Sequence, residues 1–381
     1  MLSLIKNIKL YAPEFQGDKD ILMGGEKILA IADNIDVSSS VAKVWDAQGK
    51  IATPGLIDQH VHIIGAGGKH GFASMTPEIM LSEFVACGST TVVGLLGTDA
   101  SARSVKTLYA KTKSLDVEGI TAYMFTSYFG INPVTITGSI QDDLIFIDKV
   151  IGCKLAISDE RSSYPTTLEI LRHLRDVHVG GLISGKGGIL HIHLGGLTTK
   201  MDILFELVQQ FEFPIKLISP THVGRSKDLF DQALEFARLG GMIDITTGAS
   251  KYIEPWKMVL YAMEQGVSLN QITFSSDGHA GIPKKNGNGE SEGFTKAPIF
   301  HNLNQARALV KEGGMDIGKA FSVITSNPAK NLSLKNKGKL VVGADADMCL
   351  FDEDLNLLNV FGKGKMLMDE GKVLVKGSFE S

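Results

Sequence analysis

Two histidines, His60 and His62, stand at the end of the largely apolar run 51–59. If this segment is a strand, both side chains point to the same face, because they are two residues apart. Two imidazoles on one face can bind the same metal ion, and imidazole is a preferred ligand of zinc. Taken alone the pair is a weak indication, because it could serve any metal or none.

Further side chains that can bind a metal stand in or just after four later apolar runs; they are Lys154, His193, His222 and Asp277. Each has a simpler explanation: Asp277 could cap the following segment, and Lys154 could pair with a carboxylate. These explanations account for single residues. They do not explain why side chains of types that can bind metal recur at one end of five different apolar runs. His191 faces the same side as His193, one layer deeper, so we interpret it as a core residue or a support for a ligand.

The middle of the chain alternates short apolar runs with longer amphipathic stretches, which is typical of βαβ units on a parallel sheet. The expected strands are 56–61, 90–96, 120–126, 152–157, 188–194, 215–221, 241–246 and 271–276. Helical patterns lie between most of them, as in 76–87, 168–177, 201–211 and 229–239. We predict a (β/α)8 TIM barrel over 53–335, whose site lies at the carboxyl ends of the strands. A doubly wound open sheet is the alternative, but no Gly-x-Gly-x-x-Gly follows the first strand.

Both ends of the chain are rich in β patterns. A hairpin is expected at 20–31, with Gly24 and Gly25 at its turn. Near the other end, strands are expected at 346–351, 365–368 and 372–376, with 369–371 as the turn between the last two. We therefore predict that 1–52 and 336–381 meet in one small β-sandwich domain.

Composition narrows the class of protein. The chain has 381 residues, 44% of them hydrophobic and 21% charged, with a formal net charge of −4, so neither nucleic acid nor an anionic membrane is an expected partner. Its three cysteines, Cys87, Cys153 and Cys349, are scattered, which fits a reducing compartment. The first nine residues lack the apolar core of a signal peptide, and no run reaches the length of a membrane span. We expect a cytoplasmic protein.

The order H-x-H, Lys, His, His, Asp on a barrel resembles the amidohydrolase superfamily, and 53–62 is similar to its first motif. The segments that resemble the isoaspartyl dipeptidases within it are 93–99, 135–139, 156–159 with Arg161, 220–223 with Arg225, and 243–246. This similarity runs nearly end to end, including both terminal β segments.

The resemblance implies a metal centre of two zinc ions. His60, His62 and Asp277 would bind one ion, His193 and His222 the other, and a carboxylated Lys154 would bridge both. A free lysine has a pKa near ~10.4 and cannot bind metal while protonated, whereas its carbamate offers one oxygen to each ion. The nucleophile would be a hydroxide between the metals, and Asp277 would carry its proton to the leaving amine.

The resemblance also implies how a substrate would be held. Arg161 and Arg225 match positions that contact substrate, and guanidinium groups bind carboxylates through two hydrogen bonds. Gly67, in the glycine-rich loop 65–68, and Thr98, after the second strand, match substrate-contacting positions too.

Three positions depart from the family pattern. Lys69 stands where the family has a glutamate that meets the substrate amine, and two ammonium groups at contact distance repel. Phe129 falls where a tyrosine is expected near the scissile carbonyl, although a shift of one residue would bring Tyr128 there. Gly281 stands where the family has a serine. The site for the substrate amine is therefore expected to be altered.

We predict a binuclear zinc enzyme that hydrolyses β-aspartyl (isoaspartyl) dipeptides. The alternative enzyme is a cyclic-amide or N-acyl amino acid hydrolase of the dihydroorotase or hydantoinase kind, and a different class is a scaffold without activity. The partner would be a small dipeptide or amide, and the resemblance implies a homo-oligomer, with an octamer as one candidate. Residues 282–293 form either a lid beside the site or a plain surface hairpin.

Overall fold

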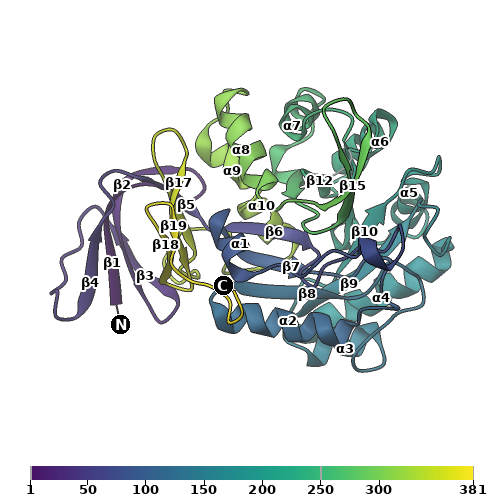
Figure 1. Cartoon of the computed structure of the whole chain (residues 1–381), viewed down its shortest axis with the longest axis horizontal. Coiled ribbons are helices and arrows are strands. Elements are labelled where there is room, and N and C mark those ends of the chain that lie inside the picture. The colour runs from purple at the N-terminus through teal and green to yellow at the C-terminus, as the bar shows by residue number, and fades with distance from the viewer. Residues whose placement is uncertain (1, 249–250, 381) are drawn as a thin grey trace.

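The computed structural model describes residues 2–248 and 251–380, and its centre is a barrel of eight parallel strands (Figure 1). In spatial order the strands are β6 (Leu56–Val61), β7 (Ser89–Gly94), β8 (Thr121–Ser127), β9 (Val150–Ile157), β10 (Ile189–Leu194), β11 (Ile218–Thr221), β12 (Ile243–Thr246) and β13 (Ile272–Ser275). The barrel closes where Val61 pairs with Gly278 and the amide of His62 donates to the carbonyl of Gly278 at 2.9 Å. The predicted (β/α)8 fold and all eight strands are confirmed.

Helices follow the barrel strands one by one and cover them from outside (Figure 1). They are α1 (Leu81–Ala86), α2 (Val105–Glu118), α3 (Ile140–Phe146), α4 (Thr167–Ser184), α5 (Asp202–Gln209), α6 (Lys227–Arg238) and α7 (Pro255–Glu264). After β13 come α8 (His301–Lys311), α9 (Ile317–Ser322) and α10 (Ser326–Asn331). Every residue of β6, β7, β9 and β10 is buried, because both faces of these strands are covered. Within the described ranges, no helix has the length and apolar character needed to cross a membrane.

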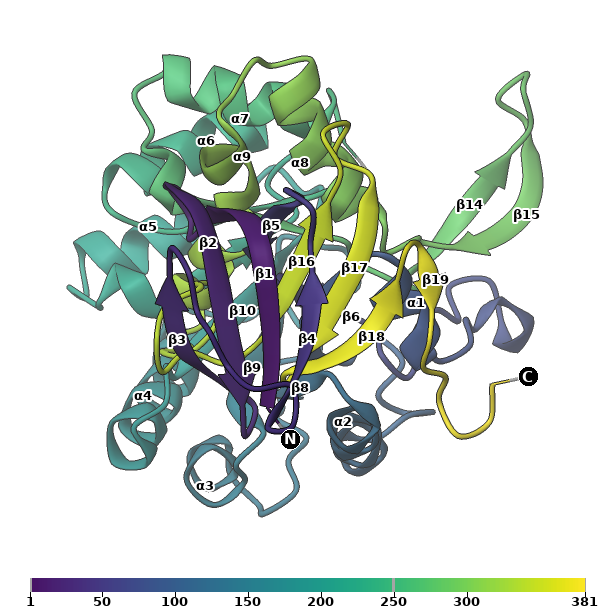
Figure 2. The same ribbon diagram turned by 90° about the vertical axis from the view of Figure 1, so that its left-hand side faces the viewer.

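Strands from the two ends of the chain join in one nine-stranded sheet beside the barrel (Figure 2). The first five are β1 (Leu2–Tyr11), β2 (Phe15–Gly24), β3 (Lys27–Ala32), β4 (Ala42–Asp46) and β5 (Ile51–Pro54). The last four are β16 (Met348–Phe351), β17 (Leu357–Gly362), β18 (Lys365–Asp369) and β19 (Lys372–Val373). Antiparallel pairing of β5 with β16 joins the two halves, and residues from both share a separate apolar core. The expected β domain built from both termini is confirmed, with its strands hydrogen-bonded as one continuous sheet.

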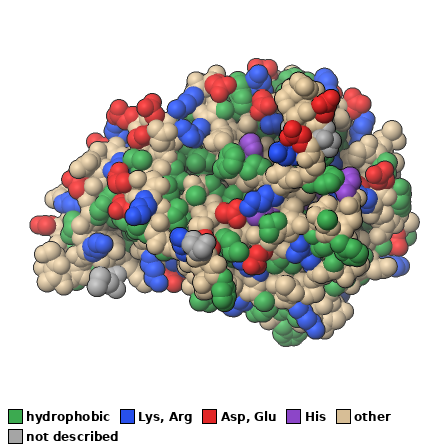
Figure 3. Space-filling model, in the orientation of Figure 1, with side chains coloured by type: hydrophobic (Ala, Val, Ile, Leu, Met, Phe, Trp, Pro, Cys, Tyr) green, Lys and Arg blue, Asp and Glu red, His purple; other side chains and the backbone are tan. Residues whose placement is uncertain are grey.

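A two-stranded hairpin, β14 (Gly281–Lys285) and β15 (Ser291–Lys296), projects from the barrel just after β13 (Figure 2). It includes residues 282–293, which were expected to be either a lid beside the site or a plain surface hairpin. Lys296 ties the base of the hairpin to Glu83 of α1 through a 2.6 Å ion pair. Over the face drawn in Figure 3, acidic and basic side chains are interspersed, which agrees with the small net charge.

Candidate functional site

The six predicted metal-binding residues lie at one end of the barrel, on five different strands. His60 is in β6 with His62 directly after it, Lys154 is in β9, His193 is in β10, His222 follows β11, and Asp277 lies two residues after β13. In a parallel barrel the carboxyl ends of all strands open on the same face. The prediction that these residues share one face is therefore met by the fold.

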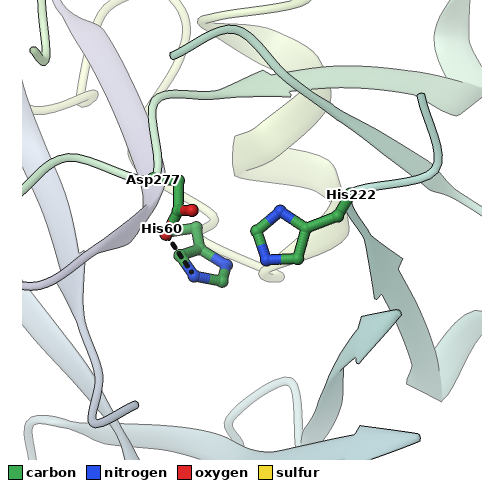
Figure 4. A group of neighbouring side chains, drawn as sticks. All are labelled: His60, His222 and Asp277. Atoms are coloured by element: carbon green, nitrogen blue, oxygen red, sulfur yellow. Dashed lines mark ion pairs between the residues drawn. The ribbon is translucent and has the colours of Figure 1, made fainter. Parts of the chain in front are cut away.

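The side chains converge at that face. The Nε2 atoms of His60 and His62 lie 3.2 and 3.3 Å from Oδ1 of Asp277. Ligand atoms of His60, His222 and Asp277 all lie within 4.8 Å of one another (Figure 4). The rings of His193 and His222 are 4.5 Å apart, centroid to centroid. Side chains at these distances can bind metal ions together.

Two of these residues have an unusual backbone conformation. His222 has φ 66° and Asp277 has φ 53°, both in the left-handed region that residues with a Cβ seldom adopt. Each stands at the point where the chain leaves a barrel strand. Strained backbone persists where surrounding structure holds it, and it is concentrated at functional sites.

The chemical state of the imidazoles suits metal binding. Burial, together with the nearby Lys154, lowers the pKa of His60 to about 3. Burial also lowers the pKa of His193 and His222 well below the usual value. These rings are therefore neutral at pH 7, which is the form that binds a metal.

Lys154 is the most telling member of the group. Its Nζ is buried and has no hydrogen-bond partner in the described part of the chain. Burial lowers the pKa of this amine to about 7, so much of it is uncharged near neutral pH. An uncharged amine beside four imidazoles and a carboxylate fits a metal centre, since an isolated buried ammonium would be costly.

Neighbouring side chains orient two of the imidazoles. Nε2 of His193 lies 3.0 Å from Oδ2 of Asp159, which leaves Nδ1 as the nitrogen available to a metal. Arg161 holds the same carboxylate through Nε at 2.7 Å and Nη2 at 2.5 Å. Against the effect of burial, these hydrogen bonds hold the pKa of Asp159 well below its usual range. Nδ1 of His222 contacts Thr246 Oγ1 at 2.6 Å, which leaves its Nε2 available.

Asp159 and Thr246 were not predicted as site residues. Both lie just past or at the end of a barrel strand, β9 and β12 respectively, which is the position that singled out the other six. Asp159 also stands two residues before Arg161, so its place in the sequence carried a usable signal.

Two neighbouring cavities that share part of their lining lie at this end of the barrel. The inner one has a volume of about 60 Å³ and is lined by His60, His62, Lys154, His193 and Asp277 among others. The outer one has a volume of about 980 Å³. Five residues line both cavities: Gly67, Lys69, Thr98, Arg161 and Arg225. All five belong to the seven residues that were predicted to contact substrate. The other two, Phe129 and Gly281, line the inner cavity alone.

The lining that the two cavities share, called the passage here, contains three basic side chains, Lys69, Arg161 and Arg225. Asp277 is the one acidic residue among the described residues that line the inner cavity, and Asp159, in the lining of the outer cavity, is paired with Arg161. Arg225 Nε is buried and has no hydrogen-bond partner within the described residues. The passage is therefore suited to groups that carry negative charge.

The three departures from the family pattern lie as follows. Phe129 lines the inner cavity and its ring is 4.6 Å from that of His193, centroid to centroid. The hydroxyl of Tyr128 instead lies over Gly130, where an added Cβ would meet it at 2.4 Å. Gly281 lines the inner cavity opposite Gly67. The structure thus gives the place beside the metal-binding residues to Phe129 and not to Tyr128.

The known proteins that the chain is similar to are hydrolases. Residues 216–374 match the model of the amidohydrolase family. The β-aspartyl dipeptidase of Fervidobacterium islandicum AW-1, solved in complex with a β-Asp-Leu dipeptide, is 41% identical, with 98% of each chain covered and a TM-score of 0.91. A dihydroorotase of Streptococcus pyogenes is 26% identical over 402 residues, covering 91% of this chain and 89% of the relative. A deacetylase of Agrobacterium fabrum is 25% identical, covering 92% and 83%.

Proposed function

This chain belongs to the amidohydrolase family and, within it, to the β-aspartyl dipeptidases, and on that basis we propose that it hydrolyses the isopeptide bond of β-aspartyl dipeptides at a two-zinc centre. The observation that carries the proposal is the convergence of six side chains of types that can bind metal beside a passage lined by Arg161 and Arg225. The extent of the similarity, 98% of the chain at 41% identity, supports the same substrate class.

The residues divide into two sets of ligands joined by Lys154. His60, His62 and Asp277 would hold one ion, and His193 and His222 the other. Zinc, when bound, supplies a Lewis acid that lowers the pKa of water and polarises a carbonyl. The uncharged amine of Lys154 would form a C–N bond with CO2 and release one proton, and the resulting carbamate has two oxygens with which to bridge the ions.

The arginines would bind and orient the substrate. A β-aspartyl dipeptide carries two carboxylates, one on the aspartyl residue and one on the leaving residue. Nε of Arg225 has no hydrogen-bond partner among the residues that the structure describes, so it is available to a ligand. The contacts of Arg161 with Asp159 use its Nε and Nη2 and leave Nη1 for a ligand. Paired hydrogen bonds from a guanidinium group hold a carboxylate in a defined position as well as balancing its charge.

Asp277 would move the proton. Its carboxylate lies in the inner cavity at 3.2 and 3.3 Å from His60 and His62. From there it can take a proton from the attacking water and give it to the leaving nitrogen as the C–N bond breaks. Without that proton the leaving group would be an amide anion, which is far too basic to depart at neutral pH.

A panel of substrates tests the proposal. The zinc-loaded protein is offered β-Asp-Leu, α-Asp-Leu, N-acetyl-β-Asp-Leu and dihydroorotate, and release of leucine or ring opening is measured. We expect β-Asp-Leu to give the highest kcat/KM of the four. Turnover confined to the capped or cyclic amides would contradict the proposal.

A second candidate function is hydrolysis of capped or cyclic amides. It is favoured by Lys69, which shares the passage with Arg161 and Arg225 and gives no acceptor to a substrate amine. Dihydroorotase and deacetylase relatives that match over nine-tenths of the chain also support it. The same panel separates the two candidates, because only the capped and cyclic compounds lack a free α-amine.

A further inference from the structure

We propose that His191 is a positioning residue, which fixes the ring orientation and the tautomer of His60 so that Nε2 of His60 faces the metal centre. This inference rests on the proposed metal centre. His191 is not one of the six metal-binding residues and lies one layer deeper in the barrel, two residues before His193 on β10.

The contact between the two histidines is direct. Nε2 of His191 lies 2.9 Å from Nδ1 of His60, while Nε2 of His60 lies 3.2 Å from Asp277. His191 is fully buried, and its ring stacks on that of Phe125 with centroids 4.8 Å apart and an angle of 12° between the planes. The stacking prevents the ring of His191 from turning away. His60 is thus held from the side opposite to the metal centre.

A chain of polar residues supports His191 from below. Its Nδ1 lies 3.2 Å from Oγ of Ser219, which also accepts a hydrogen bond from Nδ2 of Asn331 at 3.0 Å. Asn331 donates in addition to Oε1 of Gln59 at 2.9 Å, and Gln59 donates to Asp244 at 2.7 Å. Both oxygens of Asp244 accept hydrogen bonds from buried donors, so the orientation of each amide in the chain is determined.

The direction of the hydrogen bonds follows from what a metal requires. A metal bound to Nε2 of His60 needs the lone pair of that atom, so the proton of His60 must be on Nδ1. Nδ1 then donates to Nε2 of His191, and the proton of His191 is on Nδ1, where it donates to Ser219. Metal-binding histidines commonly donate to a carboxylate, a carbonyl or water. Here the acceptor is a neutral imidazole, which adds no negative charge to the site.

The test compares zinc binding in variants of the full chain. His191→Phe and His191→Met remove the acceptor while keeping an apolar side chain of similar size, and His191→Gln keeps an acceptor near the position of Nε2. His173→Phe is the matched control, because His173 is another buried histidine, on the helix α4 outside the barrel, and it does not line the inner cavity. Zinc affinity is measured by competition with a chromophoric chelator, and the melting temperature of the metal-free protein is measured alongside.

We expect zinc affinity at one site to fall roughly 10- to 100-fold in the Phe and Met variants. The Gln variant and the His173 control should stay within about threefold of wild type, and metal-free melting temperatures should change little. The inference is overturned if the apolar variants bind both zinc ions as tightly as wild type, or if the Gln variant is as weak as they are. A wild-type chain that binds no zinc would overturn the metal centre itself, which is a different result.

A measurement on the wild-type chain needs no apolar variant to fold. Two-bond 15N–1H correlation in the zinc-loaded, histidine-labelled protein reports which ring nitrogen carries the proton, and the spectrum of His191→Gln assigns the signal of His191. A proton on Nδ1 of His191 is expected. A proton on Nε2 would exclude acceptance from His60 and would overturn the inference.

Discussion

Nε2 of His60 lies 3.2 Å from Oδ1 of Asp277; His60 is in β6, the first strand of the barrel, and Asp277 lies two residues after β13, the last. The two strands are also joined by the pairing of Val61 with Gly278. The segments that close the barrel therefore also bring two of the candidate metal ligands together. A change that loosens this seam is expected to reduce metal binding as well as stability.

Asp159→Asn should weaken metal binding through His193. The two oxygens of the carboxylate accept hydrogen bonds from Nε2 of His193 and from Arg161. An amide has a single acceptor oxygen, so it cannot accept from both donors as the carboxylate does. We expect zinc affinity to fall roughly 10- to 100-fold, as is usual when the partner of a metal-binding histidine is lost. Chelator competition measures it, with the exposed Asp228→Asn as control. Unchanged zinc affinity would show that Asp159 positions Arg161 but does not orient His193 for metal binding.

Restoring zinc to metal-free protein should require bicarbonate. Nζ of Lys154 has no hydrogen-bond partner within the described ranges, and burial lowers the pKa of this amine to about 7, so it can react with CO2. In CO2-depleted buffer, zinc alone should restore activity slowly, and added bicarbonate should speed recovery severalfold. Lys154→Arg should recover none, since guanidinium stays protonated. Equal recovery with and without bicarbonate would argue against carboxylation.

Lys69→Glu should shift the choice between free and capped amines. The change replaces a cation in the basic passage by a group that can accept from an ammonium. We expect kcat/KM for β-Asp-Leu to rise at least tenfold, about 1.4 kcal/mol, and that for N-acetyl-β-Asp-Leu to fall. Lys284→Glu on the exposed hairpin makes the same charge change and should alter neither. If kcat/KM changes by the same factor for both substrates, Lys69 does not contact the end of the substrate that carries the amine.

Two facing glycines should respond differently to substitution. Gly67 has φ 112°, and a Cβ there would lie 2.4 Å from the carbonyl oxygen of Ser74. Gly67→Ala should therefore destabilise the protein by about 2 kcal/mol and impair activity. At Gly281 the nearest atom to an added Cβ is 3.6 Å away, so Gly281→Ser should change stability by no more than about 0.5 kcal/mol. Urea unfolding of both variants checks the pair, and equal destabilisation would contradict it.

The stability contributed by Glu83 should depend on pH. Hydrogen bonds from His279 and Lys296 outweigh the effect of burial and lower the pKa of Glu83 from 4.5 to about 2. A carboxyl group with a depressed pKa stabilises the fold above its unfolded pKa and loses that effect as pH falls through the folded pKa. The contribution should be about 1 kcal/mol at pH 7, given solvent screening, and should decline from pH 4.5 towards pH 2.

Urea midpoints of Glu83→Gln and wild type, measured from pH 7 down to pH 3.5, test this dependence. Glu235→Gln, at an exposed position on α6, is the control and should match wild type throughout. A difference between Glu83→Gln and wild type that does not shrink with falling pH would show that the loss is steric.

The sequence by itself determined the barrel, the strands and the residues at the strand ends. These follow from local physics, because apolar runs of strand length and amphipathic helices between them must bury their apolar faces together. His60, His193 and Asp277 could be recognised as candidates for the same reason: each stands where its own strand ends. The meeting of both termini in one β domain could also be predicted, from β patterns at 20–31 and 346–376, whereas their pairing as one continuous sheet was seen only in the structure.

Only the tertiary structure decided what each of these residues touches. The partners of His193 and His60, namely Asp159 and His191, depend on how neighbouring strands are staggered, which no local pattern records. The choice of Phe129 over Tyr128 depends on a turn after β8, where one residue of shift reverses which side chain faces the cavity. The basic passage likewise arises because loops distant in sequence bring Lys69, Arg161 and Arg225 to one opening, and charges interact through space rather than along the chain.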